Sequence, residues 1–263
     1  MTYDYRPPTA DRGLSTNAIS AIIPAYNEEK YIGEVVKQTR KFADEVIVVD
    51  DHSTDNTKEL CQRLGAKVVT NEYRKGYIGA IKTGFQRASR EIIVTLDADG
   101  EHEPGDIPRL VEPILMGKAD LVLGRRQEIP RISERFINSF TNLQVKVADS
   151  GTGFRALKKE LASKLDLKGK CTCGTLVLEA NHHGATIVEV PITVHRTPER
   201  RSVAWGHFRQ IFYVLPWLFR PTVKKSKNPT DSINSTNSTN LDQSLSVSIY
   251  LNQSPSISRN SND

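Results

Sequence analysis

The sequence AISAIIPAYNEEKYIGEVVKQTRKFADEVIVVDD, residues 18–51, decides the fold class. It begins with an apolar run typical of a buried strand. From Asn27 it continues with acidic residues in a first turn, which predicts a helix over 27–42. The segment DEVIVVDD, residues 44–51, is a second strand, and its run of β-branched residues indicates burial on both faces. A strand, a helix and a second strand in this order form the unit of a parallel sheet.

The same alternation continues along the chain. Residues 53–65 predict a helix that ends at a glycine, 66–71 a third strand, 76–89 a third helix and 90–99 a fourth strand. We therefore expect an α/β fold with a Rossmann-like, doubly wound, mostly parallel sheet and helices on both of its faces. Ligands of such sheets bind outside the carboxyl ends of the strands.

Charge and composition divide the chain into segments. Of its 263 residues, 36 are basic and 31 acidic, and the net charge of +5 arises in 196–225, where seven basic residues stand against one acidic residue. A basic surface confined to one segment argues against nucleic acid as the partner. We expect a flexible lead over 1–17, a folded domain over 18–204, a basic aromatic helix over 205–225, and a disordered tail rich in Ser, Asn and Thr over 226–263.

The N-terminal sequence and the apolar runs bear on location. No apolar segment of a secretory signal follows the first residues, and no run reaches the roughly 18 apolar residues of a spanning helix. Three cysteines are too few for a disulfide framework. We expect a cytoplasmic protein.

Acidic residues gather where two of the predicted strands end. Asp97 and Asp99 flank Ala98 after the fourth strand, and Asp50 and Asp51 end the second. Paired carboxylates suit Mg²⁺ or Mn²⁺, which bridges protein oxygens to the phosphates of a substrate. A solvated acidic turn is the alternative for the DAD sequence alone, but the second acidic pair favours metal-assisted nucleotide binding. The P-loop and dinucleotide-binding glycine motifs are absent from the sequence.

Six ordered motifs carry a resemblance to a known family. They are PAYNEE (24–29), VVDDHSTDNT (48–57), LDADGEHEP (96–104), LGRR (123–126), DSGTGFRAL (149–157) and EVPI (189–192). Together they resemble the GT-A, family 2 glycosyltransferases, specifically the dolichyl-phosphate mannosyltransferase-like branch. The resemblance implies a GT-A fold and a metal-dependent, inverting hexosyltransferase. Its donor would be a nucleotide-sugar of the GDP-mannose or UDP-glucose type, and its acceptor a polyprenyl phosphate such as dolichyl phosphate.

The resemblance also implies roles for individual residues. The nucleotide-sugar would be bound by Pro24, Tyr26, Glu28, Asp51, Asp97, Ala98, Asp99, Arg126 and Arg196. The metal ligands would be Asp97, Asp99 and Glu101, the last standing where the branch usually has Gln. The catalytic set would be Asp97, Asp99, Arg126 and the pair Arg135 and Ser139, which keeps the spacing of residues thought to hold the lipid phosphate. After EVPI the run RTPERRS departs from the family pattern, so Arg196, Arg200 and Arg201 are alternatives for the diphosphate contact.

Two amphipathic segments bear on the acceptor. Residues 205–219 include six aromatic side chains beside basic residues, which suits a helix lying in a membrane interface, with core packing as the alternative. Its apolar stripe contains Phe208, Ile211, Phe212 and Leu215. Residues 132–147 carry a second stripe, for which core packing is the better expectation. This stripe contains Ile132, Phe136, Phe140, Leu143 and Val147.

Three functions follow from these patterns. The first is a peripheral enzyme on the cytoplasmic face of a membrane that transfers a hexose to a polyprenyl phosphate, an anion that needs no general base. The second is a family 2 transferase that adds a sugar to a hydroxyl of a growing glycan, with Asp149 as base unless that residue merely anchors a turn. The third is a non-catalytic protein that uses the basic segment for binding, and the intact DADGE sequence argues against it.

Overall fold

The computed structural model describes residues 18–129, 131–195 and 204–220, with side chains from Arg209 onward in the last segment. The lead over 1–17, the tail over 226–263, and Arg196, Arg200 and Arg201 lie outside the described residues. Within the described part of the chain, seven strands form one sheet in the order β3-β2-β1-β4-β6-β5-β7. The α/β fold with a mostly parallel sheet is confirmed.

The strands of this sheet are parallel except for β6. Their bounds are β1 Ile19–Ala25, β2 Glu45–Asp50, β3 Lys67–Thr70, β4 Ile92–Thr95, β5 Leu121–Arg125, β6 Arg155–Lys158 and β7 Ile187–Pro191. Strand β6 runs antiparallel to both of its neighbours, β4 and β5. The beginning of β6, at Arg155, is paired with Thr95 at the end of β4. The loop that precedes β6 therefore reaches the edge of the sheet at which the parallel strands end.

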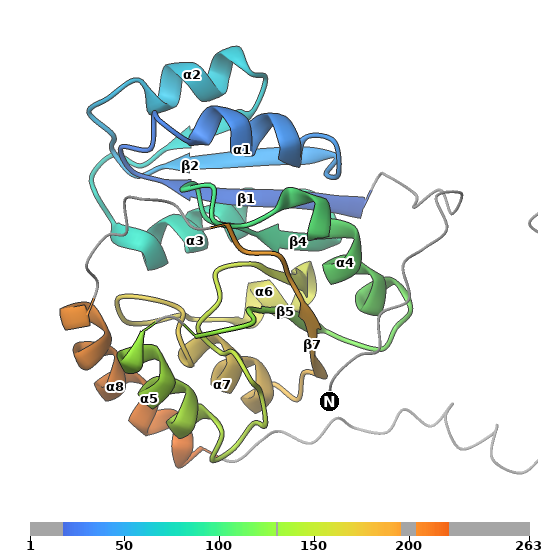
Figure 1. Cartoon of the computed structure of the whole chain (residues 1–263), viewed down its shortest axis with the longest axis vertical. Coiled ribbons are helices and arrows are strands. Elements are labelled where there is room, and N and C mark those ends of the chain that lie inside the picture. The colour runs from blue at the N-terminus through green and yellow to red at the C-terminus, as the bar shows by residue number, and fades with distance from the viewer. Residues whose placement is uncertain (1–17, 130, 196–203, 221–263) are drawn as a thin grey trace, which may run out of the picture. The chain divides into compact units, whose positions relative to one another are not determined.

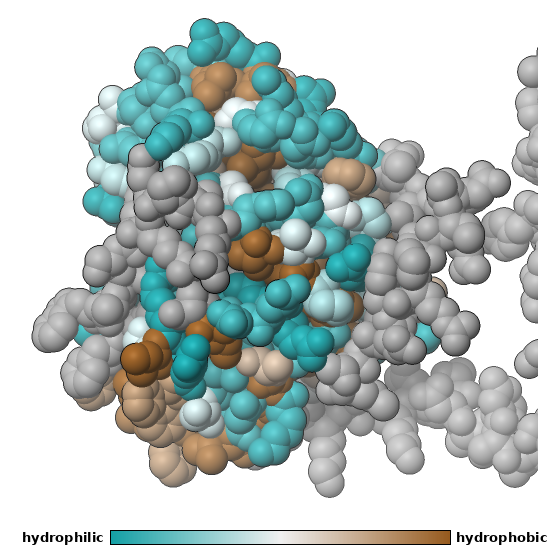
Figure 2. Space-filling view, in the orientation of Figure 1, coloured by the Kyte–Doolittle hydropathy of each residue, from teal (hydrophilic) through white to brown (hydrophobic). Residues whose placement is uncertain are grey.

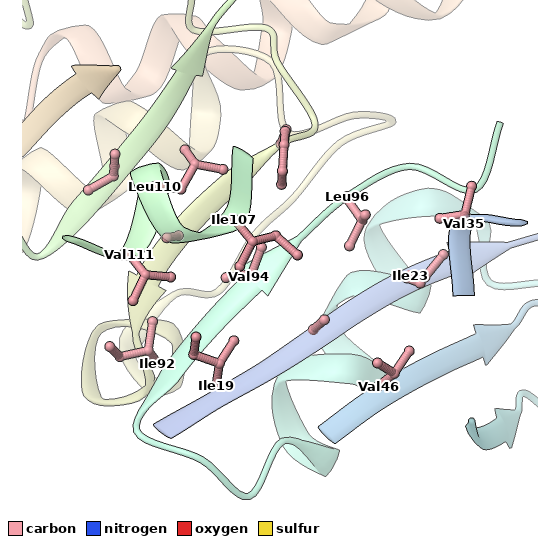
Figure 3. Packing of buried hydrophobic residues seen from close by; sticks show 14 of the residues in the cluster. Ile19, Ile23, Val35, Val46, Ile92, Val94, Leu96, Ile107, Leu110 and Val111 are labelled. Atoms are coloured by element: carbon pink, nitrogen blue, oxygen red, sulfur yellow. The ribbon is translucent and has the colours of Figure 1, made fainter. Parts of the chain in front are cut away.

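Helices cover both faces of the sheet, which makes three layers (Figure 1). One face packs against α1 (Ile32–Thr39), α2 (Thr57–Arg63) and α4 (Ile107–Leu115), the last preceded by a 3₁₀ turn at Pro104–Asp106. The other face packs against α3 (Gly76–Arg87), α6 (Lys159–Lys164) and α7 (Thr175–His182). Figure 3 shows the first of these interfaces, where Ile107 and Val111 of α4 lie beside Ile92 and Val94 of β4.

The helix predicted from Asn27 begins five residues later, at Ile32. Asn27 has a positive φ of 53°, which a helix does not allow. Its amide donates to the hydroxyl of Ser53 at 3.0 Å, and its side chain contacts Thr54. Residues 27–31 therefore form a loop that is bonded to the loop after β2, and Asn27 does not cap α1.

Helix α5 (Ile132–Thr141) corrects part of an expectation, because three of the five residues of the predicted stripe are exposed, whereas Phe140 and Val147 pack in the core. Ile132 is 71%, Phe136 58% and Leu143 71% exposed. The inner face of α5 instead carries Ile137 among polar residues, and the buried polar residues are Glu134, Asn138 and Thr141. Their polarity predicts that these three side chains face solvent. They are buried instead, because each forms a hydrogen bond within the protein.

Helix α8 (Ala204–Leu218) packs against α5 and α7. Its inner face includes Gln210 and Val214, both fully buried, whereas Phe212 and Phe219 are 68% and 85% exposed. In Figure 2 hydrophobic side chains gather over α5 and α8, at the lower left. We call this surface the apolar face, and it consists of Ile132, Phe136, Leu143, Phe212, Tyr213 and Phe219. Among the described residues, no helix is both long and apolar enough to cross a bilayer.

Candidate active site

A cavity of about 780 Å³ lies at the carboxyl ends of β1, β2 and β4. Most of the residues predicted from the sequence line it, although they come from four separate parts of the chain. These residues are Pro24, Tyr26, Glu28, Asp51, Asp97, Ala98, Asp99, Glu101 and Arg126. The fold thus brings into one cavity the side chains that sequence motifs alone had assigned to one site.

Asp51 shapes one end of the cavity. Its Oδ1 accepts hydrogen bonds from Asn71 Nδ2 and from the amide of Lys75, both at 2.8 Å. Its Oδ2 accepts from the amide of Gly76 at 2.7 Å. Gly76 has a φ of +76°, a conformation that favours glycine. Asp51 therefore fixes the loop that leads into α3, in addition to facing the cavity.

The same end of the cavity contains a stacked pair. The guanidinium carbon of Arg74 lies 3.8 Å from the centroid of the Tyr26 ring, a cation–π geometry. Arg74 is exposed, and both residues line the cavity. The pair offers a flat, polarisable surface of the kind on which a nucleobase stacks.

The three carboxylates of the DADGE sequence, Asp97, Asp99 and Glu101, line the cavity. Asp97 is about a third exposed (32%), and the amide of Glu101 donates to Asp99 Oδ1 at 3.0 Å. Burial, and next to it the charge of Asp97, raises the pKa of Asp99 to about 6. Burial also raises the pKa of Asp97 above its usual range. The carboxylates are crowded and poorly solvated, a setting in which a bound cation lowers the cost of ionisation.

The donor set fits Mg²⁺ or Mn²⁺ only in part. The side chains of Asp97, Asp99 and Glu101 all offer the hard oxygen ligands that these ions prefer. Within the described part of the chain, however, no three acidic, histidine or cysteine side chains converge closely enough to hold an ion by themselves. An ion that takes two protein carboxylates and completes its shell from substrate phosphates and water matches both observations.

Polar side chains that the sequence did not predict act on Asp97. Arg155, 1% exposed, donates from Nη1 to Thr172 Oγ1 at 2.5 Å. Against the larger effect of burial, the charge of Arg155 and the hydroxyl of Tyr77 both act to lower the pKa of Asp97. Arg155 belongs to the DSGTGFRAL motif and Tyr77 to the third helix, so the only signal was that both lie near recognised motifs. Arg155 and Tyr77 therefore favour the ionised form of the Asp97 carboxyl.

Gly153 packs directly on the same carboxylate. A Cβ atom at this position would lie 2.2 Å from Asp97 Oδ2 and 2.6 Å from Oδ1. Its carbonyl accepts a hydrogen bond from Thr95 Oγ1 at 2.8 Å, so the backbone is held against β4. Only glycine leaves room for Asp97 at this point.

Arg126 forms the centre of a buried ion cluster. Its Nε and Nη2 donate to the two carboxylate oxygens of Asp149 at 2.7 and 2.9 Å, and Nη2 also donates to Glu134 at 2.8 Å. Burial disfavours the charged form, but the two carboxylates outweigh it and raise the pKa of Arg126. Asp149 is 1% exposed and also accepts from the amide of Gly151 at 3.1 Å. These bonds favour the anchoring role of Asp149 over that of a general base.

Arg135 and Ser139 lie away from the cavity lining, on the exposed side of α5. Arg135 donates to the carbonyl of Ile129 at 3.2 Å, and Ser139 donates to the carbonyl of Arg135 at 3.0 Å. The lining residues of α5 and its N-cap are instead Glu134 and Arg131, which form an ion pair at 2.9 Å. The sequence contained no signal that separated Arg131 from other surface arginines.

Comparison with known proteins identifies the family. The model for "Glycosyl transferase family 2" matches residues 20–177 of the chain, a span that includes all of the cavity-lining residues named above. This chain is a family 2 glycosyltransferase.

Two relatives of this transferase have names that specify an acceptor. The UDP-N-acetylglucosamine--dolichyl-phosphate N-acetylglucosaminyltransferase of Methanococcus voltae is 33% identical over 216 residues, which cover 68% of this chain and 86% of the relative. The polyprenol monophosphomannose synthase of Mycolicibacterium smegmatis is 30% identical over 243 residues, which cover 81% of this chain and 91% of the relative. Both names describe transfer to a polyprenyl-type lipid.

A solved structure confirms the GT-A fold. The glucosyl-3-phosphoglycerate synthase of Mycobacterium tuberculosis, in complex with Mn²⁺, UDP and glucosyl-3-phosphoglycerate, aligns with a TM-score of 0.70. The alignment covers 84% of this chain and 88% of that protein, at 23% sequence identity. At this identity the likeness establishes the fold of the transferase and leaves its substrates to be argued from its own residues.

Proposed function

We propose that this transferase moves a hexose from a nucleotide-sugar to a polyprenyl phosphate, such as dolichyl phosphate, at the cytoplasmic face of a membrane. The observation that carries the proposal is the double role of α5. Its inner face contributes Glu134 to the cavity, and its outer face presents Ile132 and Phe136 to solvent. An acceptor with an anionic head and an apolar tail can therefore meet the cavity and the apolar face together.

The donor would lie along the carboxyl ends of the strands. Tyr26 and Arg74 would stack against the base, and Asp97 and Asp99 would hold Mg²⁺ or Mn²⁺ together with the diphosphate, with Glu101 beside them. When bound there, the ion supplies Lewis-acid stabilisation of the charge on the departing nucleoside diphosphate. The packing of Gly153 would keep Asp97 in place for this task.

The acceptor phosphate would attack the anomeric carbon from the face opposite the leaving group, so the configuration is inverted. A phosphate monoester is already an anion near neutral pH and therefore needs no general base. The engagement of Asp149 with Arg126 agrees with this, because no free carboxylate is required on the acceptor side. The names of the Methanococcus and Mycolicibacterium relatives support the same class of acceptor.

The apolar face would rest in the membrane interface. Six large hydrophobic side chains are exposed on α5, α8 and the residues that follow them, and Arg135, Arg209 and Arg220 are exposed on the same segments. Aromatic and aliphatic groups beside cations are the composition of a surface that binds anionic lipid. This placement makes the transferase peripheral to the membrane.

A panel of GDP-sugars and UDP-sugars, assayed with dolichyl phosphate and Mg²⁺ or Mn²⁺, tests the acceptor class. We expect release of nucleoside diphosphate and a glycosylated lipid only when the lipid phosphate is present. Parallel reactions contain dolichol, which lacks the phosphate, and oligosaccharides with free hydroxyls. Transfer to the oligosaccharides with no product from dolichyl phosphate would refute the proposal in favour of a hydroxyl acceptor.

Sedimentation with vesicles that contain phosphatidylserine tests the membrane contact. The double variant Phe136→Ser, Phe212→Ser removes two exposed rings of the apolar face, and we expect it to lose most vesicle binding. The control is Leu115→Ser on α4, an exposed apolar residue (49%) remote from that face in sequence and element. Equal sedimentation of the double variant and the wild type would rule out this surface as the membrane contact.

A further inference from the structure

The loop between α6 and α7 forms part of the cavity wall beside Arg126. Lys170, Cys171, Thr172 and Cys173 line the cavity. The amide of Gly174 donates to the carbonyl of Ser150 at 3.3 Å, and Cys173 Sγ lies 4.0 Å from the carbonyl oxygen of Gly151. A Cβ atom on Gly151 would in turn lie 3.2 Å from Arg126 Nη2. These contacts place the loop next to the buried ion cluster.

Gln210 of α8 fixes the backbone of this loop. Its Oε1 accepts from the amide of Lys170 at 2.9 Å and from that of Cys171 at 3.3 Å. Its Nε2 donates to the carbonyl of Cys171 at 2.8 Å and to Thr175 Oγ1 at 3.2 Å. Gln210 is fully buried, so these bonds are shielded from water. Gly169 has a φ of +112° and packs against the same amide group, so no side chain fits there.

The basic side chains that line the cavity differ in whether a carboxylate or an aromatic ring lies close to their charge. The lining contains five Lys and Arg residues: Lys30, Arg74, Arg126, Arg131 and Lys170. Arg126 and Arg131 share Glu134, Arg74 lies over Tyr26, and Lys30 lies 5.0 Å from the Tyr31 ring centroid. Among the residues that the structure describes, the ammonium of Lys170 has no carboxylate or aromatic-ring partner; the side chain is exposed, and its backbone amide is held by Gln210.

We propose that Lys170 binds the phosphate of the acceptor. A rigid backbone that carries an uncompensated cation into a cavity is preorganised for an anion, because little further ordering is needed on binding. The loop that carries Lys170 contacts Ser150 and Gly151, next to Arg126, and on this ground we assign the lysine to the acceptor and not to the nucleoside. Arg135 and Ser139, on the outer side of α5, lie outside this lining. The inference rests on the proposed function and names a residue that the motifs did not.

The test compares Lys170→Ala, Lys170→Arg and the control Lys168→Ala. Lys168 is two residues away, exposed, and paired with Asp166 at 2.8 Å outside the cavity. Steady-state KM values are measured separately for the nucleotide-sugar and for the lipid phosphate, and binding of farnesyl phosphate is measured by calorimetry with farnesol as the uncharged probe.

For Lys170→Ala we expect the acceptor KM and the Kd for farnesyl phosphate to rise by about 10- to 100-fold, the range for losing a hydrogen bond to a charged group. The donor KM should stay near that of the wild type, and Lys170→Arg should restore most of the acceptor affinity. Lys168→Ala should match the wild type. Gln210→Met, which keeps the volume and loses the bonds to the loop, should raise the acceptor KM without changing the donor KM.

An unchanged acceptor KM in Lys170→Ala, or a rise in the donor KM alone, overturns the inference while transfer to lipid phosphate by the wild type still supports the proposed function. A wild type that transfers nothing to lipid phosphate and does not bind farnesyl phosphate overturns both. The activity of the wild type therefore distinguishes a failure of the Lys170 inference from a failure of the proposed function.

Discussion

Replacing Gly153 with alanine tests how closely the active site depends on the position of Asp97. The new Cβ atom would lie 2.2 Å from Asp97 Oδ2. An ordinary van der Waals contact begins at 3.4 Å, so the carboxylate must withdraw by about 1 Å. The φ of Gly153 is not in the positive range that favours glycine, so the added methyl group acts by contact and not by backbone strain.

The withdrawal should appear in catalysis more than in folding. A displacement of about 1 Å at a reacting centre costs roughly 100-fold in rate. Overpacking by one methyl group lowers the free energy of unfolding by about 1–3 kcal/mol, which leaves most domains folded. We therefore expect Gly153→Ala to be folded, to release nucleoside diphosphate about 100-fold more slowly, and to need a higher concentration of Mg²⁺ or Mn²⁺ for half-maximal rate.

The assay follows nucleoside diphosphate release against donor and metal concentration, with circular dichroism to check the fold. Gly105→Ala is the control, because its Cβ atom would lie 3.3 Å from the flexible side chain of Glu103, outside the cavity lining. A folded Gly153→Ala variant with wild-type kcat/KM and metal dependence would refute the conclusion that this glycine positions Asp97.

Three further perturbations have expected outcomes. Asp99→Asn should lower kcat by about 100-fold or more, the scale of losing one electrostatic stabiliser, and nucleoside diphosphate release measures it. Asp149→Asn should destabilise the fold by about 3 kcal/mol, because Arg126 loses a buried partner; an inactive variant with wild-type thermal stability would restore the general-base role. For Glu45, burial raises the pKa, but hydrogen bonds from two serines and a lysine outweigh it and lower the pKa from 4.5 to about 2. Its ionised form therefore stabilises the fold above pH 4.5, and the contribution is lost as the pH falls through about 2, so the melting-temperature difference between the wild type and Glu45→Gln should shrink over this range.

The sequence was sufficient for strands β1 to β4, whereas β5 and β7, which also pair in parallel, were not assigned as strands. Continuous apolar runs of β-branched residues mark β1, β2 and β4, because strands buried on both faces leave few polar positions. The apolar run of β4 also shows where that strand ends. The acidic residues that follow it could therefore be placed at the carboxyl ends of the strands, where ligands bind. Strand β6 was not predicted as a strand, since its four residues, RALK, carry too short a pattern to be distinguished from a loop.

The rest of the site depends on contacts between distant segments. The periodicity over 132–147 did not separate exposed from buried positions, because Ile132 and Phe136 are exposed whereas Val147, beyond the end of α5, is buried. Glu134 and Asn138 are buried because Arg126 and the backbone of Ser150 supply their partners, and those partners lie outside α5, so its periodicity does not reveal them. Gln210 is a similar case, because a glutamine in an aromatic helix carries no signal of the loop that it holds.

The reversed direction of β6 has a consequence for engineering the molecule. The chain enters β6 at the edge where catalysis would occur and leaves it at Lys158, which is paired with Ile92 at the opposite edge. That opposite edge also receives the turn at Gly117, where an added side chain would meet no neighbour within 4 Å, although its φ of +66° favours glycine. A reporter peptide or affinity tag inserted beside this turn would stand a full strand length away from the substrates. The molecule thus has one edge suited to chemistry and another that can accept new sequence.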